Sequence, residues 1–589
     1  MRNKFPKTGC PRHASASLVL VILLSFAATN SRSRQTAKPA QPAKPAYAIE
    51  ALTPDGQARL RTILDEAKLG GLRRPDFSPY KTPLVEFYCS TGYSLAWTFH
   101  SKPTPQALAM IRVLENADAE GLVPADYDGR RWANRIAALD RAGQPAQADM
   151  VQFDVALTVS SMRYISDLHS GRVDPRLFHP GFGGEHPPYD LAQFLRERII
   201  HGPDIEAALE EAEPPLPAYR RSVQALDRYQ KLAREYHGPP LPVPRKTVDP
   251  GDSYWAMPQL AYRLRLLGDL APDAKIAPSR TVYQGSLVDA IKHFQRRHGL
   301  DSDGRIGPRT FRELNTPLAH RIRQLRLSLE RLRWLPDASG RARIIVNIPE
   351  FRLHVVGKDR RQILAMSVVV GKARKYQTPV FASAMRTVIF RPYWDVPISI
   401  QENELVPDIQ KDRGYLEKHG YEVVDRRRRV VSEGKVNAAL LEDLASGTIF
   451  ARQKPGPGNS LGLIKFDLPN PFTVFLHGTP ATALFSRPRR DFSHGCIRVE
   501  DPVALAAWVL RDNPGWTPDR IRQAMNGDRT LAVNLAKPIP ILIVYRTAVV
   551  AENGEVRFFR DIYGLDAKLE RAIASGRPYS QAAGSGTRY

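Results

Sequence analysis

The spacing of apolar residues divides the chain into a helical part and a strand-rich part. In the helical part, four apolar residues share one helical face: Val155, Val159, Met162 and Ile165. Gly171 follows this stripe, and glycine commonly ends a helix. The pattern predicts a mainly helical scaffold domain over residues 48–245. Acidic residues and histidines occur singly there, which indicates solvated helix faces rather than a catalytic centre.

A second helical unit is predicted over residues 250–316. Two apolar stripes end at Gly268 and Gly299, and Pro308 suits the first turn of a third helix. The stripes consist of Leu260, Leu264 and Leu267, and of Leu287, Ala290, Ile291 and Phe294. An arginine-rich stretch with a regular apolar face then predicts a connector helix over residues 317–340. That face carries Ile322, Leu325, Leu329 and Leu332.

After Leu335 the apolar period becomes strand-like, which predicts a mostly antiparallel β-domain over residues 341–545. The strand candidates are residues 344–348, 351–355, 364–370, 386–390, 472–476, 532–535 and 541–545. Residues 398–452 interrupt them with polar, helix-prone sequence, and a long insertion of this kind is often a lid or substrate subdomain. Asn553-Gly554 predicts a hairpin in the C-terminal region 546–589, which ends in a tail.

The N-terminal residues are typical of an exported protein. Four basic residues, Arg2, Lys4, Lys7 and Arg12, precede an apolar run from Leu18 to Ala28. This run is shorter than the roughly 20 residues of a membrane span, so residues 1–31 are predicted to be a secretory signal peptide. Residues 32–47 are rich in Pro, Ala and Lys and predict a disordered linker. A signal that stays uncleaved would instead tether the chain to the membrane.

The composition of the chain limits the classes of binding partner. The formal net charge of +24 favours a polyanion, such as nucleic acid, an anionic membrane or an acidic wall polymer. Because export is predicted, the wall polymer is favoured and nucleic acid is not expected.

The three cysteines are Cys10, Cys89 and Cys496. Cys10 precedes the apolar run and would be lost with the signal. Cys89 and Cys496 could pair in an oxidising compartment, but a protein of this size does not need one disulfide. A lone thiol beside histidines is the more suggestive pattern, and Cys89 is expected to be a passive core residue.

Two short segments contain the candidate catalytic residues. They are Phe475-Leu-His477-Gly478-Thr479 and Ser493-His494-Gly495-Cys496-Ile497-Arg498-Val499. The glycine before Cys496 permits a tight turn and a bare backbone N–H, which can stabilise an oxyanion. A neutral histidine within reach can act as base towards the thiol and as acid towards the leaving amine.

The residues alone leave the identity of the base open. His494 lies only two residues before Cys496, and at that spacing a hydrogen bond to the thiol is uncertain. His477 ends an apolar strand, and if this strand lies next to that of Cys496 it would present the imidazole directly to the thiol. A zinc site formed by His477, His494 and Cys496 is the alternative reading. It lacks a fourth ligand and any Cys-x-x-Cys spacing, so no metal and no cofactor are expected.

The same segments resemble the L,D-transpeptidase (YkuD-type) catalytic domain. Further matching segments are Val370-Gly-Lys372, Gln377-Thr-Pro379, Pro392-Tyr-Trp-Asp-Val-Pro397 and Asn459-Ser-Leu-Gly462. Residues 289–315 resemble the peptidoglycan-binding domain type 1 family. The whole is similar to the large, lid-bearing periplasmic members of Gram-negative bacteria. The expected fold is therefore multidomain α+β, with a helical scaffold domain, a three-helix peptidoglycan-binding module, and a mostly antiparallel β catalytic domain with an inserted lid.

The resemblance implies a role for each site residue. Cys496 would be the nucleophile, His477 the general base, and the carbonyl of Gly478 would orient that base. A second group would shape the oxyanion and substrate site: Ser493, His494, Gly495, Arg498 and Trp394. The implied reaction forms 3→3 peptidoglycan cross-links in the periplasm, through a cysteine thioester on a tetrapeptide donor stem. Donor and acceptor stems would be the partners, with other cell-wall synthesis proteins as further candidates.

Alternatives remain open. The same thioester could be passed to water or to a lipoprotein, which would make the protein a hydrolase or a protein-attaching transferase. A different class, a non-catalytic peptidoglycan-binding scaffold, would need no reactive thiol.

Overall fold

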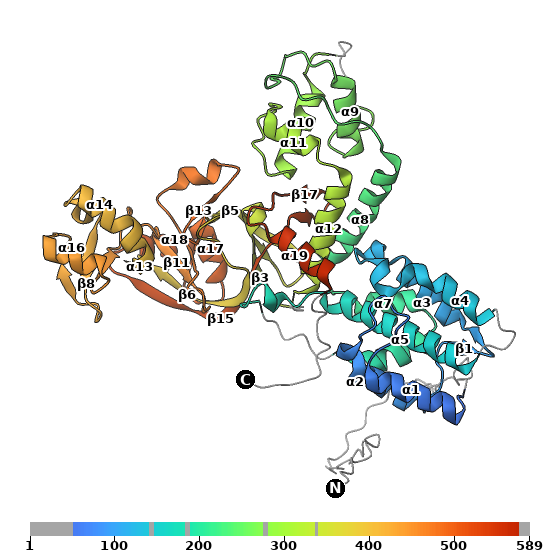
Figure 1. Cartoon of the computed structure of the whole chain (residues 1–589). Coiled ribbons are helices and arrows are strands. Elements are labelled where there is room, and N and C mark those ends of the chain that lie inside the picture. Colours follow the sequence, from blue (N-terminus) through green and yellow to red (C-terminus); the bar gives the residue numbers. More distant parts are fainter. Residues whose placement is uncertain (1–50, 141–145, 183–188, 275–280, 336–339, 577–589) are drawn as a thin grey trace, which may run out of the picture.

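The computed structural model describes residues 51–140, 146–182, 189–274, 281–335 and 340–576, and Figure 1 shows their arrangement. The predicted signal peptide, the linker and the end of the C-terminal tail lie outside these residues. Within them, none of the helices has the length and apolar character that a membrane crossing requires.

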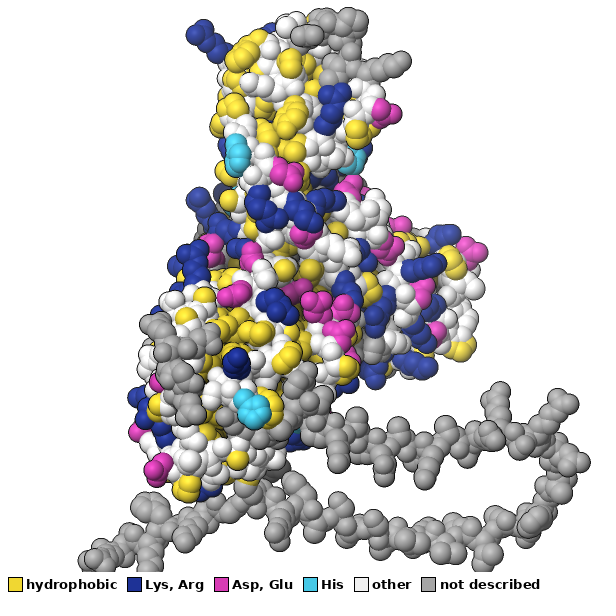
Figure 2. Space-filling model, turned by 90° about the vertical axis from the view of Figure 1, so that its right-hand side faces the viewer, with side chains coloured by type: hydrophobic (Ala, Val, Ile, Leu, Met, Phe, Trp, Pro, Cys, Tyr) yellow, Lys and Arg dark blue, Asp and Glu magenta, His cyan; other side chains and the backbone are white. Residues whose placement is uncertain are grey.

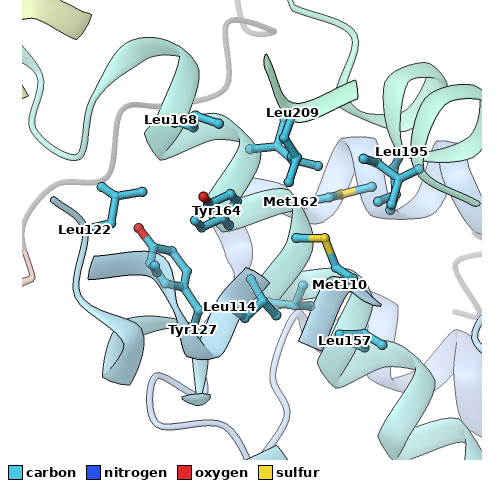
Figure 3. Close-up of a cluster of buried hydrophobic side chains, with 14 of the residues drawn as sticks. Met110, Leu114, Leu122, Tyr127, Leu157, Met162, Tyr164, Leu168, Leu195 and Leu209 are labelled. Atoms are coloured by element: carbon cyan, nitrogen blue, oxygen red, sulfur yellow. The ribbon is translucent and has the colours of Figure 1, made fainter. Parts of the chain in front are cut away.

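The first unit is helical, as predicted. Its helices are α1 (Pro54–Glu66), α2 (Lys81–Ser90), α3 (Pro105–Glu115), α4 (Trp132–Asp140), α5 (Gln147–Ser170), α6 (Leu191–Phe194), α7 (Ile205–Ala212) and α8 (Pro217–Glu235). Strands β1 (Thr98–Phe99) and β2 (Lys102–Pro103) form a small pair beside them. Helix α5 is buried along most of its length because the other helices surround it, and Gly171 ends it with a φ of 87°. Figure 3 shows part of this core.

The second unit is the three-helix module, with α9 (Met257–Leu266), α10 (Ser286–Arg297) and α11 (Pro308–Leu314) around a separate apolar core. The buried amide of Gln295 organises its loop. It donates to the carbonyl of Arg305 at 2.9 Å and accepts from the N–H of Gly304 at 2.9 Å. The predicted module is confirmed.

The third unit is a closed, mostly antiparallel sheet. Its strands are β3 (Arg343–Asn347), β4 (Arg352–Val356), β5 (Gln362–Gly371), β6 (Phe381–Phe390), β11 (Ile464–Asp467), β12 (Leu476–His477), β13 (Asp491–Ser493), β14 (Ile497–Val499) and β15 (Leu531–Val544). The order β5-β14-β12-β11-β6-β15-β3-β4 returns to β5, which closes a barrel around the core. Helices α17 (Pro502–Val509) and α18 (Pro518–Asn526) pack against it.

Two strand predictions differ from the structure. Residues 532–535 and 541–544 belong to the single strand β15, and Tyr545 lies just beyond its end. The register of β15 shifts between Asn534 and Ile539, where Pro538 cannot donate to the ladder. Residues 472–475 do not form a strand, since β12 begins only at Leu476 and Thr473 has a φ of 53°.

The insertion folds as a subdomain with its own core. It combines α13 (Ile398–Ile400), the π-helical turn η8 (Gln401–Leu405), α14 (Val406–Lys411), α15 (Tyr415–Lys418) and α16 (Ala438–Ala445) with a sheet of β7 (Trp394–Asp395), β10 (Phe450–Gln453), β8 (Tyr421–Val424) and β9 (Val430–Ser432). The buried Gln401 joins these parts, because its amide donates to the carbonyls of Leu444 and Ile449. Figure 1 shows the subdomain at the end of the barrel furthest from the scaffold.

Helix α12 (Leu318–Arg333) joins the units. Leu325 and Leu329 enter the scaffold core, whereas Leu327 enters the barrel core. Its polar face meets the C-terminal hairpin of β16 (Ala548–Val550) and β17 (Val556–Phe558), because the N–H of Ala548 donates to Ser328 Oγ at 3.1 Å. On helix α19 (Leu565–Ser575), Asp566 forms a buried ion pair with Arg331.

His293 links the three-helix module to the same hairpin. Its Nδ1 lies 2.7 Å from Asp269 Oδ1 within the module, and its Nε2 lies 3.0 Å from Glu555 Oε2 in the hairpin. The hydrogen bond to Asp269 and the charges of both carboxylates raise the pKa of His293 above its ordinary value of 6.5. The contact is therefore strongest when the imidazole is charged.

We expect the contact between the module and the hairpin to weaken as the pH rises above about 6.5. The folded-state pKa is raised, so the stabilisation is fully present below the unfolded-state pKa and is lost as the pH passes the folded-state value. Hydrogen-exchange protection factors of β16 and β17 between about pH 5.5 and about pH 9 measure this loss. His293→Gln should remove the pH dependence and the exposed control His237→Gln should keep it; pH-independent protection in the unsubstituted protein would contradict the prediction.

Candidate active site

Strand pairing brings the two predicted chemical groups to one face of the barrel wall. Strand β12 runs parallel to β14, with Leu476 opposite Ile497 and His477 opposite Arg498. Side chains alternate along strands, so His477 and Arg498 share a face with Cys496, which lies two residues before Arg498. The N–H of Ile497 donates to the carbonyl of Phe475 at 3.0 Å and fixes this register.

This face forms the floor of a cavity of about 740 Å³ beneath the insertion. Barrel residues on the floor are Lys465, Phe475, His477, Cys496 and Arg498. Insertion residues on the opposite side include Trp394, Ile400, Glu404, Leu405 and Tyr415. The structure thus brings Ser493, His494, Cys496, Arg498, His477 and Trp394 to one site, with Gly478 and Gly495 in its supporting loops.

His477 is buried and its tautomer is set by the backbone. Its Nδ1 lies 2.6 Å from the carbonyl oxygen of Gly478, which can only accept. The neutral imidazole therefore carries its proton on Nδ1 and leaves Nε2 free to accept one. Burial, together with the positive charge of Arg498, lowers the pKa of His477 to about 3.

Gly462, in a separate turn, allows the backbone after His477 to pack closely. Gly462 has a φ of 63°, and a Cβ there would lie 2.7 Å from the backbone N of Thr479. The turn that ends the matched Asn459-Ser-Leu-Gly462 segment therefore packs directly on the backbone that follows His477, which no other residue type would permit.

Cys496 is a free thiol, so the pairing with Cys89 that the composition allowed does not occur. Cys89 lies half-buried on α2 in the scaffold rather than fully inside the core. Burial raises the pKa of Cys496, although the backbone of Phe475 and the charges of Lys465 and Arg498 oppose this rise. The thiol lies 3.9 Å from the carbonyl oxygen of Thr473, at the turn before β12.

The loop before Cys496 is held by a serine. Ser493 Oγ donates to the carbonyl of Cys496 at 2.6 Å and accepts from the N–H of Gly495 at 3.2 Å. Gly495 has a φ of 115°, in the region that favours glycine, and its carbonyl accepts from Thr378 Oγ1 at 2.7 Å. These bonds fix the direction in which the thiol leaves the backbone.

His494 faces the insertion. Its Nε2 lies 2.6 Å from Glu404 Oε1 on η8, and its ring centroid lies 4.5 Å from that of Tyr376. The structure therefore separates the two histidines that the sequence left as alternatives: His477 lies on the barrel floor, and His494 contacts the insertion.

Arg498 and Lys465 make the floor positive. Within the described residues Arg498 Nε is buried without a hydrogen-bond partner. Lys465 lies opposite His477 on β11, and its Nζ is 4.2 Å from the ring centroid of Phe475. Sequence reasoning missed both Lys465 and Glu404. The alternation of apolar and polar residues in Ile464–Asp467 would have identified Lys465, whereas nothing local distinguishes Glu404 from Glu402.

Among the residues that the structure describes, no group of three His, Cys, Asp or Glu side chains is arranged to hold a metal ion. The cavity side chains that can act as a nucleophile, a base or a source of positive charge include the thiol of Cys496, the imidazole of His477 and the cationic groups of Lys465 and Arg498.

Comparison with known protein families identifies the family that the barrel matches. Residues 341–530 match the L,D-transpeptidase catalytic domain. The barrel of this chain is an L,D-transpeptidase catalytic domain. Residues 257–314 match a family described as "Putative peptidoglycan binding domain", and residues 82–226 match a family described as "Scaffold domain".

A curated protein of Haemophilus influenzae, named "Putative L,D-transpeptidase", is 32% identical over 249 residues. The match covers 42% of this chain, and the chain spans about half the length of that relative, at 49%. A solved L,D-transpeptidase from Stackebrandtia nassauensis is 14% identical, with 51% of this chain and 97% of that chain covered. Its TM-score is 0.21, which is too low to support any argument about the transpeptidase domain.

The pKa directions predict that the resting site holds a neutral thiol and a neutral imidazole at pH 7. The rate of Cys496 alkylation by iodoacetamide should then rise with pH up to and above about 9, because the raised thiol pKa keeps the thiolate scarce below it. His477→Gln should leave this profile almost unchanged. Peptide mass spectrometry resolves Cys496 from the other cysteines, and a rate plateau from about pH 5 to about pH 8 would instead indicate a preformed ion pair.

Proposed function

We propose that this protein is an L,D-transpeptidase that forms 3→3 cross-links in peptidoglycan through a thioester on Cys496. The observation that carries the proposal is the shared face of β12 and β14, where His477, Cys496 and Arg498 line one cavity beneath an inserted lid. The match of residues 341–530 to the catalytic domain supports the reaction class.

In the first step, Cys496 Sγ attacks the carbonyl of the third residue of a tetrapeptide stem. The thiol proton passes to His477 Nε2, a C–S bond forms, and the amide C–N bond breaks. The same proton then passes to the departing amine of the terminal D-alanine. Because both groups are neutral at rest, the thiolate forms only as substrate binds, and the Gly478 carbonyl keeps the accepting nitrogen of His477 unprotonated.

The tetrahedral oxyanion needs a donor close to Cys496. The N–H of Gly495 already donates to Ser493 Oγ, which leaves the N–H of Cys496 itself as the nearer backbone donor. Arg498, whose Nε has no partner within the described residues, supplies a positive charge for a carboxylate of the stem.

In the second step, a side-chain amine of another stem attacks the thioester. An N–C bond forms, the C–S bond breaks, and the amine proton returns to Cys496 through His477. Water competes with the amine, so the cavity must exclude it until the acceptor arrives. The insertion suits this task, because Trp394 and Glu404 line the cavity opposite the thiol.

This function requires an extracytoplasmic location, where peptidoglycan lies. The peptidoglycan-binding match, the excess of basic residues that Figure 2 shows over much of one face, and the predicted signal peptide all support it. Donor and acceptor stems are then the partners, nucleic acid is not, and other cell-wall synthesis proteins are candidate associates.

Incubation with purified disaccharide tetrapeptides tests the proposal. The unsubstituted protein should release D-alanine and form dimers, Cys496→Ala should form none, and His477→Gln should lower the rate by about 10²–10⁴-fold. Shortened monomers alone would identify a hydrolase, and conjugates formed only with an added lipoprotein would identify an attaching enzyme. Equal wall cross-linking by the unsubstituted protein and Cys496→Ala in cells without related enzymes would leave only the scaffold alternative.

The contact between Glu404 and His494 leads to a prediction about how the thioester divides between hydrolysis and cross-linking. Glu404→Gln removes the charge that ties η8 to the loop of Cys496, so the lid should open more often and admit water. We expect the ratio of hydrolysed monomer to dimer to rise several-fold, measured by chromatography of the products. Glu402→Gln, on an exposed neighbour in the same turn, is the matched control. An unchanged ratio in Glu404→Gln would show that the contact between Glu404 and His494 does not hold the insertion over the cavity.

A further inference from the structure

The scaffold domain contains a cavity of about 840 Å³ that the proposed reaction does not use. It lies between α3 and α7, and the end of α5 closes it. Its apolar part is formed by Ala109, Val113, Leu168, Ile205 and Leu209. Figure 3 shows Leu168 and Leu209 beside Tyr164, which also lines the cavity. Ligand sites commonly have this size and this mixture of apolar surface with a few polar groups.

The polar part of the lining is acidic. Five carboxylates line it, Glu120, Asp204, Glu206, Glu210 and Glu213, against the single cation Arg112. This sign is opposite to that of the chain, which carries a net charge of +24. Figure 2 views the molecule from the scaffold side and shows Asp and Glu side chains gathered next to apolar surface.

A second observation points to a ligand. Tyr164 is only 3% exposed and lines the cavity, yet its hydroxyl makes no hydrogen bond to any described residue. The nearby carboxylates Glu120 and Glu213 both act on this phenol electrostatically. Gln106 Oε1 also lines the cavity and is buried without a partner within the described residues. The amide oxygen of Gln106 can only accept a hydrogen bond and the hydroxyl of Tyr164 can accept one, so both groups could bind a donor of a ligand.

Protein cations balance this charge only in part. Arg220 contacts Glu210 at 3.2 Å and Glu213 at 3.5 Å; Arg220 and Glu210 are more than half exposed, whereas the Glu213 side chain is 13% exposed. Arg333 donates to the backbone carbonyl of Glu120 and to the hydroxyl of Tyr219, behind the cavity. Burial and the charges of Glu120 and Glu210 raise the pKa of Glu213 to about 7, and an incoming cation would stabilise its charged form.

We infer that this cavity binds the ammonium group of an amine-bearing peptidoglycan stem peptide, with Tyr164, Glu120 and Glu213 as its acceptors. The inference rests on the proposed function, because the acceptor stems of that reaction carry a primary amine on a short aliphatic chain. The acidic groups suit the amine and the apolar wall suits the aliphatic chain. Because the cavity lies in the scaffold rather than the barrel, the bound stem would be held without reacting.

Photo-cross-linking of the full-length Cys496→Ala protein tests the inference. The probe is a disaccharide tetrapeptide with a free third-residue amine and a diazirine at its carboxyl end, and mass spectrometry maps the labelled peptides. Labelling of residues 105–116 and 204–213 should fall at least tenfold when the amine is acetylated. Tyr164→Phe and Glu213→Gln should each lower it by about the same factor. Glu213→Asp should restore part of it, and the exposed control Glu115→Gln should not change it.

Equal labelling by the acetylated probe, or unchanged labelling in both variants, would overturn the inference. So would stronger competition by a lysine tripeptide than by unlabelled tetrapeptide, because the cavity would then recognise a protein segment. Tyr164→Phe keeps the ring and its packing, so a folding defect in Glu213→Gln would not decide the result. Dimer formation by the unsubstituted enzyme is scored separately, so a failure of the cavity inference and a failure of the proposed function give different results.

Discussion

Helix α12 is the constraint on which the arrangement of the other units depends. It is apolar on two sides, with Leu329 in the scaffold core and Leu327 in the barrel core, so neither unit can pack without it. Its buried Glu330 accepts from the N–H groups of Arg172 and Val173, just after α5 ends. Leaving such a carboxylate unpaired in the interior would cost about 1–3 kcal/mol or more, so these bonds fix the orientation as well as the contact.

The chemical site depends on a smaller constraint inside the barrel. Strand β12 is only two residues long, yet its parallel register with β14 alone decides that His477 and Cys496 share a face. A shift of one residue would turn the imidazole to the other side of the wall. The turn at Thr473 and the packing of Gly462 against Thr479 hold this short strand from its two ends.

Much of this could be predicted from the sequence, because helix stripes, strand runs and the Cys-His segments are local patterns. The stripes that end at Gly268 and Gly299 gave the three-helix module, and the motif around Cys496 gave the thiol and two candidate histidines. The sequence alone could not predict that arginines of α12 are buried or which groups they contact. Arg331 and Arg333 lie outside the apolar face predicted for this helix, and their partners Asp566 and Tyr219 come from distant segments. Glu404 was missed for the same reason, since only the folded insertion brings it to His494.

The two cavities differ in the sign of their charge: the floor of the barrel cavity carries cationic side chains, and the scaffold cavity is lined mainly by carboxylates. In the barrel, Lys465 and Arg498 surround a thiol and an imidazole that burial keeps uncharged, so negative charge appears only when Cys496 ionises and is then stabilised. In the scaffold, burial and the nearby carboxylate of Glu120 raise the pKa of Glu213, and an incoming cation would stabilise its charged form. Under the proposed function, a positive reaction site would attract the carboxylates of a stem peptide, and a negative cavity would attract its amine. The barrel and the scaffold would then hold two stems, and α12, whose side chains enter both cores, would set the distance between them.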